Sequence, residues 1–106
     1  MSDPQGLSLQ RSKLSNISKA GSELLKALSH EGRLTILALL CEKERSVTEL
    51  ETILELRQPA VSQQLARLRH DNLVATRREG KLIYYSLASE QAREVVSTLT
   101  RLYGEG

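Results

Sequence analysis

The sequence lacks tryptophan and phenylalanine, and its aromatic content is limited to three tyrosines. A core without larger rings has to be built from leucine, isoleucine, valine and alanine, which favours a helical protein. No apolar run approaches the ~18 residues that a membrane span needs, and the first residues lack the apolar segment of a secretory signal. We therefore expect a cytoplasmic protein with no membrane partner.

Cysteine is nearly absent, since Cys41 is the only one. An internal disulfide is excluded, which fits a reducing compartment. Zinc and soft metals need three or four converging ligands, and His30, Cys41 and His70 form no closely spaced ligand pair. A glycine-rich phosphate loop and a recognisable nucleophile-base motif are also missing. The sequence predicts no metal, no other cofactor and no enzymatic activity.

A strong net charge is missing as well, because the formal charge is only +2. Its distribution is uneven. Residues 57–81 hold six Lys or Arg against two acids, net +4, whereas residues 42–56 hold two against five, net −3. A basic segment next to an acidic one predicts a surface that attracts phosphate on one face and repels it on another.

The 106 residues are enough for one small domain. We expect a flexible tail over residues 1–8 and a single domain over residues 9–106, separated by the start of a helical apolar pattern at Leu9. The stretch 42–45 is expected to be an exposed turn. Five helices are expected: from about residue 9 to 28, from 30 to 42, from 46 to 55, from 58 to 70, and from the cap Ser89 to Gly104.

Two of these helices follow each other after a very short turn. Ser46 and Glu49 have the spacing of a capping box at the start of the third helix. Pro59 lies where a first-turn proline is tolerated at the start of the fourth. Two helices joined in this way are typical of a helix-turn-helix, in which the second helix enters the major groove of DNA.

The fourth helix has one apolar and one polar face. Val61, Leu65 and Leu68 form an inward stripe at helical spacing. The other face carries amide, hydroxyl and guanidinium groups, which suit base edges and phosphates. The candidates for base-edge contacts are Gln58, Ser62, Gln63 and, at the margin between groove and core, Gln64. Six basic residues are candidates for phosphate contacts. Three lie on this helix or just before it and three lie on the hairpin that follows: Arg57, Arg67, Arg69, Arg77, Arg78 and Lys81.

After residue 72 the pattern changes to period two, breaks at Glu79 and Gly80, and resumes as LIYYSL. This indicates a two-stranded β-hairpin with basic residues near its tip. Tyr84 and Tyr85 point to opposite faces of its second strand, so one should pack on the core, and the other either reaches a phosphate with its hydroxyl or packs as well. The fold class is therefore mostly α with a small β-hairpin: a winged helix-turn-helix.

The apolar stripes of the first and last helices have no obvious partner in a domain whose centre is filled by the second helix. We expect them to pack on each other and on a second copy of the chain, forming a homodimer; the alternative is that both close over the core of a monomer. The residues expected at the dimer interface are Leu14, Ile17, Leu24, Val95, Leu99, Leu102 and Tyr103.

Several of these segments together resemble the ArsR/SmtB family of dimeric winged-helix transcription repressors. The resemblance covers about two thirds of the chain, and its most specific pieces are HEGRLTIL, QPAVSQQLARLR and the wing LV-x-x-RREGK-x-x-YYSL. It implies a homodimer formed by the first and last helices, a recognition helix at residues 58–69, and a wing at residues 77–81 that contacts the minor groove or the backbone.

The chain departs from the sensing members of that family. Some members begin the third helix with metal-binding cysteines. The matching residues of this chain, 44–48, include no cysteine. The positions that match an Asp, His, His and Glu set on the last helix are Ser89, Gln91, Leu102 and Glu105. Only one carboxylate remains, so the resemblance does not extend to metal sensing.

Another sensing mode of the family joins two cysteines, whose positions match Ala38 and Gly104 here. An intrachain bridge is therefore impossible. A single thiol on a buried helix is usually an inert small hydrophobe. The alternative is a redox- or sulfur-responsive protein in which Cys41 forms a sulfenic acid or a mixed disulfide.

The function expected from all these features is a sequence-specific transcription regulator, most simply a repressor. Its partner is double-stranded DNA, which the homodimer binds at a pseudo-palindromic operator with its recognition helices about 34 Å apart. A winged-helix module that binds protein instead of DNA is the competing interpretation, because fold alone does not fix function. The sequence names no inducer.

Overall fold

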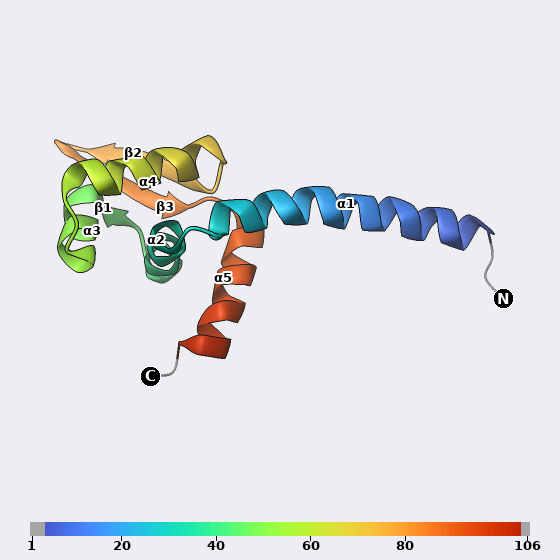
Figure 1. Ribbon diagram of the computed structural model, residues 1–106. Coiled ribbons are helices and arrows are strands. Elements are labelled where there is room, and N and C mark those ends of the chain that lie inside the picture. The colour runs from blue at the N-terminus through green and yellow to red at the C-terminus, as the bar shows by residue number, and fades with distance from the viewer. Residues whose placement is uncertain (1–3, 105–106) are drawn as a thin grey trace.

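The computed structural model describes residues 4–104, and side chains from Gln10 onward. Within that range the elements are α1 (Pro4–Leu28), α2 (Glu31–Glu42), β1 (Arg45–Ser46), α3 (Val47–Leu54), α4 (Gln58–His70), β2 (Val74–Glu79), β3 (Leu82–Leu87) and α5 (Glu90–Tyr103). Helices α2 to α4 and the strands form a body from which α1 and α5 extend in different directions (Figure 1). The radius of gyration is 17.1 Å, against about 13 Å for a compact domain of this size. The protruding helices account for the difference.

Helix α2 lies at the centre of the core, as its apolar pattern predicts. Its Ile36, Leu37 and Leu40 are buried, and it contacts α1, α4, α5 and β3. The other buried apolar residues come from the four other helices, from β2 and from the turn before it: Ala27, Leu28, Leu50, Val61, Leu65, Leu68, Leu73, Val74, Ala92 and Val96. Apolar burial of this kind, rather than intrinsic propensity, stabilises helices as short as α3.

The helix ends follow local sequence signals. Ser46 Oγ accepts a hydrogen bond from Glu49 N at 3.1 Å, and Ser46 N donates to Glu49 Oε1 at 3.2 Å, so the predicted capping box is present. Ser89 caps α5 by accepting from Ala92 N at 3.1 Å. Each of these bonds satisfies a backbone N-H that the helix itself leaves free.

The sheet has one strand more than the sequence predicts. Strands β2 and β3 form the expected antiparallel hairpin around Gly80, whose φ of 62° suits glycine in a tight turn. However, β1 pairs with the other edge of β3, so that the order is β1-β3-β2. The expectation of an exposed turn over residues 42–45 is wrong at its end: Arg45 is buried and donates to Leu39 O at 3.2 Å and to Glu42 Oε1 at 2.6 Å.

The first helix also begins earlier than expected. Helix α1 starts at Pro4, where proline is compatible with a first helical turn, rather than at Leu9. The part of the expected tail from residue 4 to residue 8 is therefore helical, while residues 1–3 lie outside the described residues.

Candidate nucleic-acid interface

Helices α3 and α4 form the predicted helix-turn-helix. The chain turns between them at Glu55, whose φ of 54° is left-handed and whose backbone N-H donates to Glu51 O. Pro59 lies in the first turn of α4. Val61, Leu65 and Leu68 are completely buried, so the inner stripe of α4 is confirmed and its other side is turned outward.

The outward side of α4 carries the candidate base-edge residues. Gln58 and Gln63 are exposed and Ser62 is half-buried. Gln58 Nε2 donates to Ser62 Oγ at 2.9 Å, which holds these two side chains together one turn apart. The exposed residues Ala66 and His70 follow Gln63 at three and seven positions, on the same side. Their helical spacing from Gln63 is a signal that the sequence analysis did not use.

Gln64 lies at the margin of this surface. It is half-buried, and its Nε2 is 3.5 Å from Nε2 of His30, which precedes α2. His30 also caps α2, because its Nδ1 accepts from Gly32 N at 3.1 Å. Gln64 therefore belongs to the seam between α4 and α2 as much as to the outward face.

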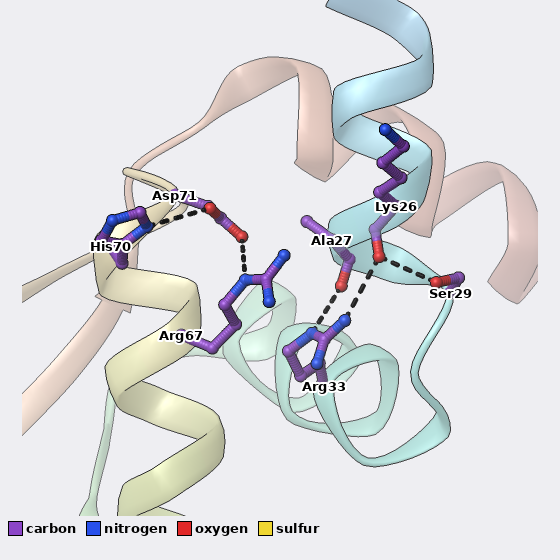
Figure 2. Close-up of polar contacts among 7 residues, drawn as sticks. All are labelled: Lys26, Ala27, Ser29, Arg33, Arg67, His70 and Asp71. Carbon is purple, nitrogen blue, oxygen red and sulfur yellow. Dashed lines mark hydrogen bonds and ion pairs between the residues drawn. The ribbon is translucent and has the colours of Figure 1, made fainter.

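The end of α4 holds a compact ion-pair group beside the end of α1 (Figure 2). Arg67 Nε donates to Asp71 Oδ2 at 2.9 Å, and His70 Nδ1 lies 3.4 Å from Asp71 Oδ1. Burial alone would raise the pKa of Asp71, but the hydrogen bonds from Arg67 and His70 lower it below its ordinary value. Arg67 is half-exposed and occupied by this carboxylate, whereas Arg57 and Arg69 are exposed.

On the wing, one arginine is occupied by two carboxylates. Arg77 Nη2 lies 2.5 Å from Glu44 Oε1, its Nε lies 3.0 and 2.9 Å from the two Glu44 oxygens, and its Nη1 lies 2.7 Å from Glu79 Oε2. Its Cζ is 4.6 Å from the centre of the Tyr84 ring, within reach of a cation-π contact. The basic segment thus touches the acidic one at Glu44. Arg78 and Lys81 are exposed and are the remaining candidate phosphate contacts of the wing.

This ion pair should break in acid. Hydrogen bonding from Arg77 is the main reason why the pKa of Glu44 lies below its ordinary 4.5, while partial desolvation opposes that shift. A lowered pKa in the folded protein means that the stabilisation is present above the ordinary value and is lost as the pH falls through the lowered one. We expect a carboxyl NMR titration of Glu44 to give a midpoint below 4.5. In Arg77→Ala the midpoint should rise; an unchanged midpoint would refute the pairing.

The two tyrosines of β3 divide as the alternation predicts. Tyr85 packs against the core, and Tyr84 lies opposite Arg77 in the strand register. Tyr84 also pairs with Ser46 of β1. The Arg77 side chain and the third strand therefore both tie the wing to the body.

All seven residues expected at a dimer interface lie on α1 or α5, the two helices that protrude from the body in Figure 1. Leu14 and Ile17 of α1 are 59 and 65% exposed, and Leu102 and Tyr103 of α5 are 57 and 78% exposed. Leu24, Val95 and Leu99 are half-buried, and Leu24 and Val95 pack against the core. Large apolar side chains that are exposed to solvent in this way are typical of surfaces that a partner covers.

Cys41 lies near the end of α2 and is half-buried. Burial raises the pKa of its thiol, and the nearby positive charge of Arg93 offsets this only partly. A raised pKa disfavours the thiolate, which is the reactive form. Among residues 4–104, no three His, Cys, Asp or Glu side chains are grouped as they would be around a metal ion, and Glu105 lies outside that range. No helix in the described part is both long and apolar enough to cross a membrane.

A helix-turn-helix followed by an antiparallel wing defines the winged helix-turn-helix fold, and the outward side of its second helix carries the polar and basic side chains that suit a DNA-binding surface. Residues 30–76 match the family model described as "Bacterial regulatory protein, arsR family". The chain belongs to this family, which consists of DNA-binding regulators rather than enzymes.

Two relatives and one solved structure support that assignment. The chain is 49% identical over 80 residues to the transcriptional activator HlyU of Vibrio cholerae, covering 76% of this chain and 74% of the relative. It is 45% identical over 80 residues to a biofilm growth-associated repressor of Agrobacterium fabrum, covering 76 and 68%. The structure of reduced HlyU from Vibrio cholerae matches with a TM-score of 0.84 at 43% identity, covering 88% of this chain and 98% of that one.

Proposed function

We propose that the protein is a homodimeric repressor that binds a pseudo-palindromic operator in the cytoplasm. The observation that carries this proposal is the outward side of α4, where Gln58, Ser62 and Gln63 form a polar surface next to exposed cations. Amide and hydroxyl groups can read base edges, and a dimer presents two such surfaces to successive major grooves. A dimer that covers an operator excludes other proteins from the same DNA, so repression needs no further device.

The apolar residues on α1 and α5 support the dimer. Leu14, Ile17 and Tyr103 would otherwise remain in water, and small domains often gain stability by pairing. The redox alternative through Cys41 is less well supported, because the raised pKa of the thiol lowers its reactivity.

We propose that all six basic residues named above contact phosphates, but that they do not contribute equally to the binding free energy. Arg57, Arg69, Arg78 and Lys81 are exposed, and no salt bridge occupies them in the described part of the chain. Arg67 and Arg77 already bind Asp71 and Glu44. They would have to exchange a carboxylate for a phosphate, which reduces the net gain.

The test is selection of duplexes from a random pool, followed by fluorescence anisotropy on the enriched site. We expect enrichment of two inverted half-sites with centres about 10–10.5 bp apart or a multiple of that spacing. A single half-site should bind much more weakly. A pool that yields no enriched sequence at low salt would refute the proposal.

Truncating Gln63 should blur sequence preference. We expect Gln63→Ala to reduce discrimination against the wrong base by about 1 to 3 kcal/mol at one position of each half-site. Competition binding with single-base variants of the enriched duplex measures this. The control is Gln91→Ala, which removes another exposed amide, on α5, and should change nothing. If Gln63→Ala kept the base preference of the unmodified protein, Gln63 would not be a residue that reads the base edges.

Neighbouring wing arginines should differ in salt dependence. Arg78→Ala is expected to lower the slope of log affinity against log salt by about 0.9, the value for one lost phosphate contact. Arg77→Ala should lower it by less, because Glu44 and Glu79 already balance its charge. Anisotropy titrations between about 50 and 200 mM salt give the slopes. Equal losses in the two variants would show that Arg77 leaves its carboxylates on binding DNA.

A further inference from the structure

His30 forms a contact between the start of α2 and the candidate reading helix α4. Its ring accepts from Gly32 N at one side and lies 3.5 Å from the Gln64 amide at the other. We propose that His30 is a positioning residue that fixes which end of the Gln64 amide faces DNA. This inference rests on the proposed operator binding for its consequence, but the contact itself can be tested without DNA.

The cap determines where the ring carries its hydrogen. A ring nitrogen that accepts a hydrogen bond has a free lone pair, so Nδ1 is unprotonated when it accepts from Gly32 N at 3.1 Å. In a neutral imidazole the hydrogen then lies on Nε2. His30 therefore presents a donor, and not an acceptor, to Gln64.

The ring donor in turn determines the orientation of the amide. With Gln64 Nε2 placed 3.5 Å from His30 Nε2, two donors would face each other. The oxygen and nitrogen of a side-chain amide are nearly equal in size, and the hydrogen-bond network decides between them. Turning the amide by half a rotation brings Oε1 to the ring N-H. The nitrogen of Gln64, with its two hydrogens, then faces away from α2.

Gly32 leaves the space that this arrangement needs. A Cβ on residue 32 would lie 3.2 Å from Cε1 and 3.3 Å from Nδ1 of His30, and 3.8 Å from Cδ of Gln64. The first two distances are tighter than ordinary contact, so a side chain would push the ring away from its cap. The contact between the His30 ring and the Gln64 amide therefore depends on the absence of a side chain at Gly32.

The segment from Ser29 to Arg33, which includes His30, is also attached to α1, as the side chains of Ser29 and Arg33 in Figure 2 show. Arg33 Nε donates to Ala27 O at 2.8 Å and its Nη2 donates to Lys26 O at 3.2 Å. Ser29 Oγ donates to the same Lys26 oxygen at 2.8 Å. These bonds cap the last turn of α1, the helix assigned to the dimer, so Gln64 is attached through His30 to the scaffold that sets the spacing of the two reading helices.

The consequence is a difference between the glutamines of α4. A glutamine reads adenine with its oxygen and nitrogen together. Because the oxygen of Gln64 faces His30, the group that Gln64 turns toward DNA is its NH2, which is a donor. It should select an acceptor, such as guanine O6 or N7 or thymine O4, or a phosphate oxygen. Gln63 has no such restraint from His30 and keeps both groups available.

The first experiment measures the ring in the free protein. Long-range proton-nitrogen NMR spectra at about pH 8 distinguish protonated from unprotonated ring nitrogens. We expect His30 to carry its hydrogen on Nε2 with Nδ1 acting as an acceptor. A ring with its hydrogen on Nδ1 would overturn the proposal, whether or not the protein binds DNA.

The second experiment is a double-mutant cycle on the enriched operator. His30→Asn keeps a residue that caps helices well but is too short to reach Gln64. We expect it to weaken binding about two- to tenfold, the lower range for coupled residues in contact, and to have almost no effect in a Gln64→Ala background. In a Gln63→Ala background the loss should persist. Equal losses in all three backgrounds would overturn the positioning role.

Melting temperatures separate folding from positioning. His30→Asn should melt close to the unmodified protein because the cap is kept, whereas His30→Ala should melt lower. If His30→Asn does not fold, the ring measurement in the unmodified protein decides the contact. If selection yields no operator, the reading role is overturned together with the proposed function, and the ring measurement still stands on its own.

Discussion

Replacing Ile17 with aspartate is expected to yield a folded monomer that binds its operator about 10²- to 10⁴-fold more weakly. Ile17 is 65% exposed in the single chain, so the protomer loses little when it is replaced. In the proposed dimer, however, the aspartate would place an unpaired charge in an apolar interface. Two linked recognition helices raise each other's effective concentration at the operator, and that gain disappears when the subunits separate.

Light scattering and fluorescence anisotropy test this expectation together. The matched control is Asn16→Asp, which adds the same charge to an exposed position of α1 outside its apolar stripe. It should remain dimeric and bind normally. An Ile17→Asp protein that is dimeric and retains full affinity would show that α1 does not form the interface. A monomer with full affinity would instead refute the bivalent mechanism.

Most of the helical architecture could be predicted because it depends on neighbours in sequence. The buried stripe of α4, the capping box of Ser46 and Glu49, and the cap at Ser89 all involve residues within one or two turns. Such local signals determine where a helix starts and which side it buries. The central position of α2 followed from its apolar residues for the same reason.

One error involves a contact between distant segments, and the other involves a helix start without an apolar pattern. β1 has only two residues, too short for any alternating pattern, and it is a strand only because β3 lies beside it. The early start of α1 at Pro4 was missed because the residues before Leu9 show no apolar periodicity. Neither feature has an apolar periodicity from which it could be predicted.

The same limit applies to the charges of the candidate interface. The sequence indicates that Arg77 is basic and near a turn, but its partner Glu44 lies 33 positions away. The contact between His30 and Gln64 spans 34 positions. Counting charges by segment therefore overestimated the free positive charge of the wing, while the margin position expected for Gln64 agrees with its half-buried state.

Truncating Leu65 should cause the largest loss of stability of the changes considered. Leu65 lies on the inner side of α4 and is 0% exposed, so Leu65→Ala removes its packing and leaves a cavity in the core. Such changes cost about 2 to 5 kcal/mol in the free energy of unfolding. For a chain of this length each kcal/mol lowers Tm by roughly 4 to 8 °C, so a fall on the order of 10 °C or more is expected.

Thermal unfolding at fixed protein concentration measures this effect, because the Tm of a dimer depends on concentration. Leu82→Ala is the control: Leu82 is 44% exposed, so the same truncation should cost less than about 1 kcal/mol. Operator binding by Leu65→Ala should fall only where unfolding becomes measurable, because the outward side of α4 is unchanged. If binding were lost at a temperature where the variant is fully folded, Leu65 would instead be needed to hold the angle at which α4 meets the groove.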